Sequence, residues 1–175
     1  MLSAKSRLVR CDRALSSSSP LHEMKHPGDP AICSKCQAVW HKGKWSLHPL
    51  TPPEIQRRAR PIVVLCPACK SDKEGNPTGI LYLTGLFLAK NRTEILNLLH
   101  NAARIAAVKN PLERIIRIKA DPEHRLVIET TSEKLARRLG RAVNKACGGT
   151  LDIRFSHVDK LVRVYWQREA VGSET

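Results

Sequence analysis

The sequence lacks any long run of apolar residues, and none of its hydrophobic stretches approaches the roughly 18 residues that span a bilayer. Binding to an anionic membrane surface would need an amphipathic anchor or a long apolar stretch. No secretory signal is evident either, so we expect the chain to stay in the cytoplasm, where thiols are kept reduced. These absences predict a soluble protein without a membrane partner.

Motifs of known catalytic centres are also missing. The chain shows no Ser/His/Asp order, GxSxG, Walker loop, GxGxxG or HExxH, and its carboxylates are scattered rather than paired. No side chain stands out as a general base, which predicts a protein that is not an enzyme, with no catalytic residues and no small-molecule substrate. A nuclease that uses histidines and glutamates on RNA remains an open alternative.

Acidic residues are scarce beside basic ones. The 175 residues include 30 Lys and Arg against 16 Asp and Glu, which gives a formal net charge of +14. Such an excess attracts polyanions over a long range, so nucleic acid is the first partner to consider. The length allows one main domain and a small additional module.

Four of the six cysteines form two CxxC pairs. Cys33 and Cys36 make the first pair, and Cys66 and Cys69 make the second. In a reducing compartment, two such pairs predict one closed structural Zn²⁺ site, because four thiolates satisfy the tetrahedral geometry of that ion and leave no open position. Redox CxxC chemistry is the alternative, and His41 or His48 could replace a cysteine as a ligand.

Composition divides the chain into four parts. We expect a flexible basic arm over 1–29, a zinc-ribbon module over 30–79, a ferredoxin-like α/β domain over 80–168 and a disordered tail over 169–175. The Arg- and Ser-rich residues 1–20 are also compatible with an organelle transit peptide. The predicted fold class is therefore α+β.

Hydrophobic periodicity in the second domain predicts strands and helices in the order β-α-β-β-α-β, with one extra strand. The expected strands cover 80–89, 112–120, 125–130, 150–155 and 161–166, and the last is expected at a sheet edge. One helix should start at Asn91-x-x-Glu94 and stop near Asn110-Pro111, and another should start with a capping box over 130–133 and end at Gly148-Gly149.

Each expected element has an apolar side. For the first helix the inward residues are Ile95, Leu98, Leu99, Ala102, Ile105 and Ala106. For the second helix they are Leu135, Leu139, Ala142, Val143 and Ala146, and for the strand that follows they are Leu151, Ile153 and Phe155. Cys147, at the end of the second helix, is expected to be a half-buried apolar residue.

The second helix also carries a basic stripe that could follow a phosphate backbone. Lys134, Arg138, Arg141 and Lys145 are spaced by four, three and four residues, which places them on one side of the helix, with Arg137 beside them. Only Glu133 is acidic in this helix, so partners at i,i+4 are missing. A merely solvated charged surface is the alternative.

A second candidate for nucleic-acid binding lies between the CxxC pairs. Trp40 and Trp45 alternate with Lys42 and Lys44, a pattern that suits stacking on unpaired bases together with phosphate contacts. Packing of both indoles inside the protein is the alternative. Additional positive charge comes from Arg57, Arg58 and Arg60, and from the last strand, Arg163-x-Tyr-Trp-x-Arg168.

The order of these features resembles a known family. Cys66-x-x-Cys69, the segment from Asn91 to His100 with its Arg92-Thr93 helix start, a strand pair and Ser132-x-x-Leu-Ala136 resemble the N-terminal half of the archaeal and eukaryotic adaptor family that binds the large ribosomal subunit and mediates its nuclear export. The first CxxC with Ala-Val-Trp-His-Lys-Gly-Lys-Trp is similar to small uncharacterised bacterial zinc-ribbon proteins. The likeness spans residues 30–168.

The resemblance implies a ribosome-associated protein whose four CxxC cysteines match zinc ligands. The adaptor family also has more cysteine pairs and a long shuttling tail, which these residues do not show, so export is not implied. We therefore expect a non-enzymatic zinc protein that binds ribosomal RNA, with ribosomal proteins as further contacts, in translation, subunit maturation or ribosome storage. The alternative is a DNA-binding zinc-ribbon transcription regulator.

Overall fold

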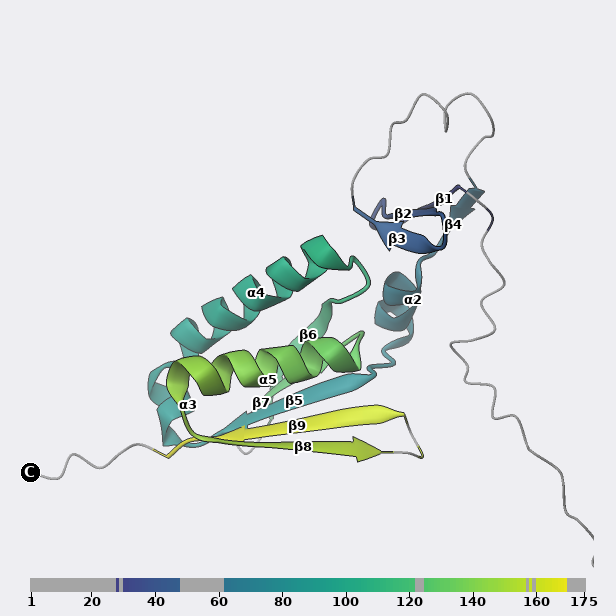
Figure 1. Ribbon diagram of the computed structural model, residues 1–175. Helices are drawn as coiled ribbons and strands as arrows, with labels where there is room; N and C mark the ends of the chain where they lie inside the picture. Colours follow the sequence, from purple (N-terminus) through teal and green to yellow (C-terminus); the bar gives the residue numbers. More distant parts are fainter. Residues whose placement is uncertain are drawn as a thin grey trace, which may run out of the picture.

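The computed structural model describes residues 28, 30–47, 62–121, 125–156, 158 and 160–169. Its elements are β1 (Ala31–Cys33), β2 (Val39–His41), β3 (Lys44–Ser46), β4 (Ile62–Val64), α2 (Pro67–Glu74), β5 (Gly79–Thr84), α3 (Leu86–Lys90), α4 (Arg92–Lys109), β6 (Ile115–Ala120), β7 (Leu126–Thr130), α5 (Glu133–Cys147), β8 (Thr150–Ser156) and β9 (Leu161–Gln167). The predicted α+β class is confirmed, with a cysteine-bearing, zinc-ribbon-like module followed by a sheet domain (Figure 1).

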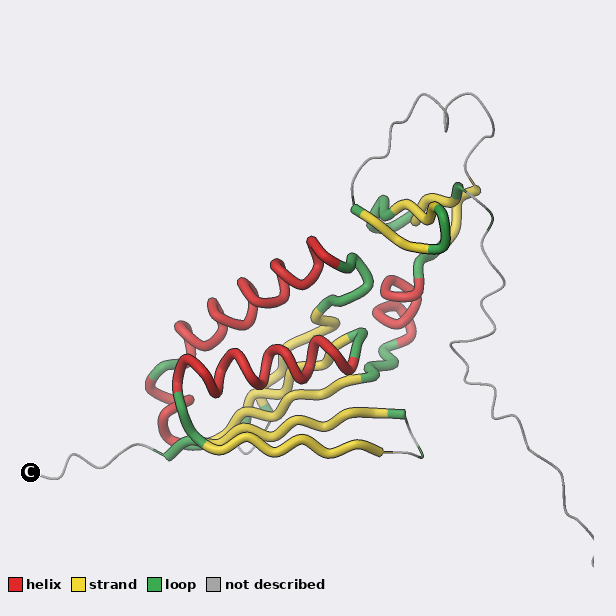
Figure 2. Tube along the Cα trace, in the orientation of Figure 1, coloured by secondary structure: helices red, strands yellow, loops and turns green. Residues whose placement is uncertain are grey.

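The ribbon module, residues 30–47 and 62–74, is built on a small four-stranded sheet. Its strand order is β3-β2-β1-β4, with β1 antiparallel to β2 and parallel to β4. Helix α2 follows β4 and lies between this sheet and the larger one (Figures 1 and 2). Pro67 at the first helical turn and the left-handed Gly75 at the C-cap explain why a helix of only eight residues forms here.

The sheet domain, residues 79–169, contains a five-stranded sheet in the order β6-β7-β5-β9-β8. Strands β5, β6 and β7 with α4 form the first half of a ferredoxin-like fold, in which antiparallel β7 separates β5 from β6. The extra strand is β9, which pairs parallel to β5 and antiparallel to β8. The expectation that 161–166 lies at an edge is therefore wrong, because β8 occupies that edge.

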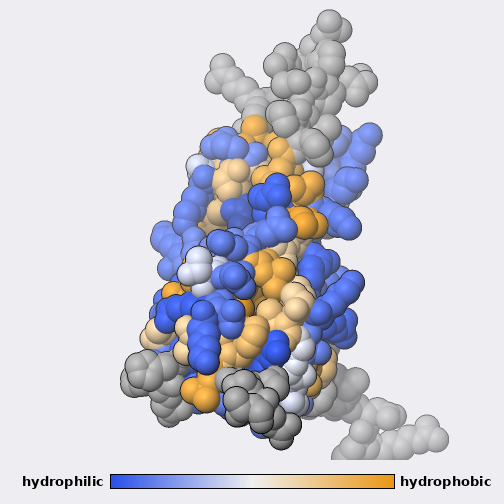
Figure 3. Space-filling view, turned by 90° about the vertical axis from the view of Figure 1, so that its left-hand side faces the viewer, coloured by the Kyte–Doolittle hydropathy of each residue, from blue (hydrophilic) through white to orange (hydrophobic). Residues whose placement is uncertain are grey.

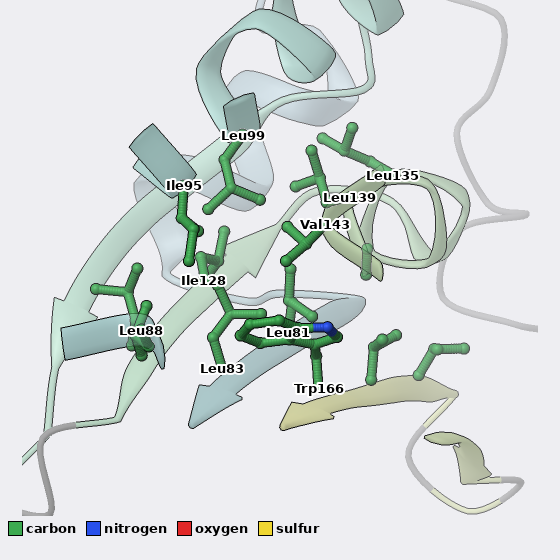
Figure 4. Close-up of a cluster of buried hydrophobic side chains, with 14 of the residues drawn as sticks. Leu81, Leu83, Leu88, Ile95, Leu99, Ile128, Leu135, Leu139, Val143 and Trp166 are labelled. Atoms are coloured by element: carbon green, nitrogen blue, oxygen red, sulfur yellow. The ribbon is translucent and has the colours of Figure 1, made fainter. Parts of the chain in front are cut away.

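Helices α4 and α5 both cover the same face of the large sheet (Figure 2). Leu81, Leu83 and Trp166 from the strands point toward Leu139 and Val143 of α5 in the close-up of the core (Figure 4). Side chains from α3, α4 and β7 complete this cluster. Because alternate strand residues face the helices, the intervening positions are left on the opposite face.

The predicted strand over 80–89 is wrong in its second half. Strand β5 ends at Thr84, and α3 begins after Gly85. Gly85 has φ of 101°, and a Cβ there would collide with the backbone carbonyl oxygen of Arg168. Close approach of a distant chain segment thus requires glycine and ends the strand, which an apolar run cannot reveal.

Helix α4 begins where predicted, with Asn91 as its N-cap residue, but the start of α5 differs from the predicted capping box. The Asn91 side chain does not cap α4 but donates from Nδ2 to the Phe87 carbonyl oxygen at 2.9 Å. For α5 the N-cap is Ser132, whose hydroxyl oxygen accepts from the Leu135 N–H at 3.3 Å. Thr130 instead donates its hydroxyl to the Gly79 carbonyl oxygen.

Several residues expected to face inward are exposed. Ile105 is 50% exposed and Phe155 is 54% exposed, and Ala146 is also at the surface. In α5 the buried side is completed by Ala136 and Gly140, because the small Gly140 lets the helix approach β9 closely. The predicted strand over 112–120 starts only at Ile115, and 112–114 form a connecting segment.

The described helices include none that is both long and apolar enough to cross a membrane.

The side of the molecule where α3 lies carries hydrophilic side chains around a band of hydrophobic ones (Figure 3).

Candidate metal centre and basic surfaces

The four CxxC cysteines meet at one point of the ribbon module. Their sulfur atoms all lie within 4.8 Å of one another, and the Cys36 and Cys66 sulfurs are 3.6 Å apart. Cys33, Cys66 and Cys69 are buried, and Cys36 is half-buried. This arrangement is suited to a metal ion held by four thiolates, as the spacing predicts.

Two different backbone structures present the two pairs. After β1 the chain folds tightly, so that the Cys33 carbonyl oxygen accepts from the Gln37 N–H at 3.0 Å, and Gln37 adopts a positive φ of 60°. The second pair lies at the start of α2, where the Cys66 sulfur accepts from the Cys69 N–H at 3.5 Å. The Cys66 N–H in turn donates to the Cys33 sulfur at 3.3 Å.

The protonation of the thiols depends on this geometry. Burial raises the pKa of Cys33, but backbone N–H groups of Cys66, Cys36 and Lys35 outweigh it and lower the pKa to about 6. Burial dominates at Cys69 and raises its pKa to about 11, and burial also raises the pKa of Cys66. Ligation therefore has to displace protons from Cys66 and Cys69, which makes metal binding weaker in acid.

One cation from the sheet domain reaches the cysteine cluster. Arg114 Nη1 donates to the Cys69 sulfur at 3.6 Å, and its Nε donates to the Pro111 carbonyl oxygen at 2.7 Å. The burial of Arg114 opposes its charge, but hydrogen bonding and attraction to Cys36, with further attraction to Cys69 and Cys66, raise its pKa. Arg114 therefore offsets part of the negative charge of the thiolates.

The position of Arg114 is fixed by Thr131, which lies just before α5. The Thr131 hydroxyl oxygen accepts from the Arg114 N–H at 2.8 Å and donates to the Leu112 carbonyl oxygen at 2.6 Å. Leu112 itself packs against the cysteine cluster. The segment 112–114 thus joins the ribbon module to the start of α5.

The basic stripe of α5 is only partly available. Arg138 Nη1 lies 2.9 Å from Glu113 Oε2, whose side chain is 6% exposed, so Arg138 has an acidic partner from outside the helix. Arg137 is half-buried and lies 5.7 Å from the centre of the Phe155 ring. Lys134, Arg141 and Lys145 are exposed and have no ion-pair partner among the described residues.

The tryptophan candidates lie on a hairpin of β2 and β3. Trp40 is directly opposite Trp45, with ring centres 5.7 Å apart, and Lys42 and Gly43 form the turn with positive φ at both positions. Trp45 packs against the cysteine cluster, which favours the structural alternative for this indole. Lys42 and Lys44 are exposed.

Other sequence candidates cannot be placed. Arg57, Arg58, Arg60, His48 and Cys11 lie outside the described residues, as do 1–27 and 170–175. Among the described residues, no histidine joins the cysteine cluster.

Two features of functional interest were missed from the sequence. Arg114 lies 45 residues from Cys69, and nothing in the local pattern links them. The pair Tyr82 and Tyr165 lies on the face of the large sheet opposite α4 and α5, with ring centres 5.0 Å apart. The alternation in β5 and β9 could have indicated the face of each tyrosine, but not the pairing of the two strands.

Comparisons with known proteins add no relative: no family model, curated protein or solved structure matches this chain. The interpretation of the site therefore depends on its own geometry and chemistry. Four sulfur ligands leave no position for a substrate, so the centre can hold a metal as a structural element.

Replacing Cys66 by serine should abolish metal binding and unfold the ribbon module, whose own core consists of little besides the cysteines and two alanines. Metal content measured by mass spectrometry should fall to background. Amide hydrogen exchange should accelerate in β1 to α2 and stay slow in β5, β7 and β9. The matched control is Cys147→Ser, outside the cluster, which should keep the metal. Loss of protection throughout the sheet domain would show instead that both parts unfold as one unit.

Arg114→Gln should weaken metal binding without abolishing it, because the substitution removes the charge beside the Cys69 sulfur. Groups that hydrogen-bond metal ligands typically change affinity by about 10- to 100-fold, and we expect the lower part of that range. Competition with a chromogenic chelator measures the effect. Arg104→Gln on α4 serves as a charge-matched control, and equal affinities of the two variants would contradict a role for Arg114 at the centre.

Proposed function

We propose that this chain is a non-enzymatic zinc protein that binds RNA, with ribosomal RNA on a ribosome or subunit as its target, in the cytoplasm. The observation that carries the proposal is the set of three exposed cations on α5, Lys134, Arg141 and Lys145. No acidic side chain among the described residues pairs with them. These three side chains can therefore bind an external polyanion.

Zinc is the metal that fits the centre best. Thiolates are soft ligands, and a tetrahedral set of four sulfurs is the usual structural site of Zn²⁺. An iron centre with four thiolates has similar geometry, and metal analysis of the purified protein distinguishes the two. The absence of a position for water or substrate at such a site supports a structural role and a protein that binds rather than catalyses.

The geometry of α5 supports contact with a phosphate backbone. Positions 134, 141 and 145 differ by seven and four residues, so at 100° per residue the three side chains lie within about 40° of one another around the helix. The helix is fixed from behind by Leu135, Leu139 and Val143, which are fully buried. A rigid row of cations of this kind binds phosphates without reading bases.

The ribbon module carries further positive charge. Exposed Lys42 and Lys44 lie on its hairpin, and the segment 112–114 ties the module to α5 through Leu112, Arg114 and Glu113. We interpret the metal as the element that holds this second group of cations in place. The resemblance to ribosome-binding adaptors supports the ribosome as the target.

The most direct test is sedimentation of the tagged protein in a sucrose gradient of cell lysate. We expect the protein to migrate with a ribosomal subunit and to return to the top of the gradient after RNase treatment. Binding of the purified protein to duplex DNA in a parallel assay tests the alternative of a transcription regulator. The ribosome proposal would be wrong if the protein stayed at the top of the gradient with and without RNase. Selective binding to one duplex DNA sequence would then support the transcription regulator instead.

Replacing Lys134, Arg141 and Lys145 together by glutamine should weaken binding to structured RNA and make it less sensitive to salt. Each lost phosphate contact reduces the magnitude of the slope of log affinity against log salt concentration by about 0.7 to 0.9, so three lost contacts should reduce it by about 2 to 3. Fluorescence anisotropy over a salt series measures it. Arg138 is left intact because its loss would leave the buried Glu113 carboxylate unpaired.

The matched control replaces Lys73, Lys90 and Lys109 by glutamine, which removes the same charge from exposed positions on α2, α3 and α4. This control variant should keep most of the affinity for structured RNA and most of the salt dependence of that affinity. An equal loss in both triple variants would mean that binding follows net charge alone and that α5 is not the contact surface.

A further inference from the structure

One face of the large sheet is left without a helix in the part of the chain that the structure describes (Figures 1 and 2). Leu81, Leu83 and Trp166 face α4 and α5, so the alternate residues of β5 and β9 face the other way. On β5 these include Tyr82 and Thr84, and their partners on β9 are Tyr165 and Gln167. This open face is distinct from the α5 surface, which lies on the opposite side of the sheet.

Planar side chains are stacked across the open face. The Tyr82 and Tyr165 rings are nearly parallel, with an interplanar angle of 9° and centres 5.0 Å apart. Arg154 of β8 continues the row, since its guanidinium carbon lies 5.0 Å from the centre of the Tyr165 ring. The Arg154 side chain is 71% exposed, so its outer side is open to a further planar group. Unpaired bases stack on both aromatic rings and guanidinium planes.

A hollow of about 570 Å³ adjoins this row and is lined by both tyrosines. This volume lies within the range of about 300–1,000 Å³ that is usual for ligand pockets. Thr84, Thr150 and Gln167 also line it and offer hydroxyl and amide groups that can hydrogen-bond the edge of a base. Two arginines lie at the hollow: Arg125, in an ion pair with Asp121, and Arg154, in an ion pair with Asp152.

Aromatic pairs across neighbouring strands also stabilise sheets without binding anything. Here, however, the pair occurs on two interior strands of the open face and is combined with a stacked arginine and a hollow lined by several hydrogen-bonding groups. The Thr84 hydroxyl already donates to the Trp166 carbonyl oxygen at 3.3 Å, and Gln167 Nε2 donates to Glu169 Oε1 at 2.9 Å. The oxygen atoms of both side chains are still able to accept hydrogen bonds, which an apolar protein partner would not supply. A strand of RNA offers bases for the planar row and amino groups for these acceptor oxygens.

We propose that the open face of the sheet binds an unpaired segment of RNA by stacking bases on the row Tyr82, Tyr165 and Arg154. The inference rests on the proposed RNA-binding function and deepens it, because it adds a site for single strands to the backbone contacts of α5. The two surfaces therefore recognise different parts of a folded RNA.

The test compares a short fluorescent oligouridylate, which has no stable secondary structure, with an RNA hairpin that has no unpaired tail. Tyr165→Val removes the ring but keeps a residue that favours strands. We expect it to weaken oligouridylate binding by about 5- to 150-fold, the range for loss of one stacked base. Binding to the hairpin should be unchanged. Tyr165→Phe keeps the ring and should keep the affinity for oligouridylate.

A measurement on the unmodified protein complements these variants. Ultraviolet cross-linking to oligouridylate, followed by mass spectrometry, should place the linked nucleotide on a peptide that contains Tyr82 or Tyr165. This result is independent of whether Tyr165→Val folds. Cross-links confined to other peptides would overturn the sheet site.

The remaining outcomes separate the two proposals. Equal oligouridylate affinity of the wild-type protein and a folded Tyr165→Val variant would overturn the sheet site and leave the function of α5 intact. If the wild-type protein bound the hairpin but not oligouridylate, the sheet site would likewise be overturned and the function of α5 would stand. Failure to bind either RNA or a ribosomal subunit at low salt would overturn the proposed function and, with it, the sheet site.

Discussion

Four sulfur atoms within 4.8 Å of one another are the constraint on which the ribbon module depends. As thiolates they would repel one another in a largely buried site, and as thiols they would leave a core made of little besides cysteine and alanine. A bound cation resolves both problems. The parallel pairing of β1 with β4 brings the ends of two strands together, so that the first cysteine pair and the start of α2 reach the same point. The local backbone of the module follows from the need to present four ligands.

The consequences extend beyond the module through the three residues 112–114. Leu112 packs on the cysteine cluster, Glu113 pairs with Arg138 of α5, and Arg114 donates to the Cys69 sulfur. Thr131 holds the same segment from the other side, just before α5 begins. The metal centre, the Glu113–Arg138 ion pair and the start of the basic helix are therefore connected by direct contacts. A change at the centre has a physical route to the position of α5, although the hydrophobic core of the sheet domain shares no residue with the cysteine cluster.

The parts of this structure that were predictable from the sequence are those set by local spacing. The two CxxC pairs predict their cluster, and the alternation and helical periodicity after residue 91 predict most of β7, α4, α5 and β8. Gly85 ends β5 because the Arg168 backbone passes close to it, and no local pattern carries that information. The same holds for the Arg138 ion pair, the contact of Arg114 with Cys69 and the position of β9 between β5 and β8. Each depends on residues that are distant in sequence.

The two proposed RNA surfaces differ in how their charge is used, which gives them different physical roles. On α5 the cations at 134, 141 and 145 have no acidic partner among the described residues, so their attraction to phosphate is long-range and weakened by salt. On the sheet, Glu129 pairs with Arg117 and Lys119, and Asp152 pairs with Arg154. Paired cations contribute little to the long-range field, so attraction there depends on stacking and hydrogen bonds at short range. The helix is therefore suited to the initial encounter with a polyanion, and the sheet to selecting RNA that offers unpaired bases.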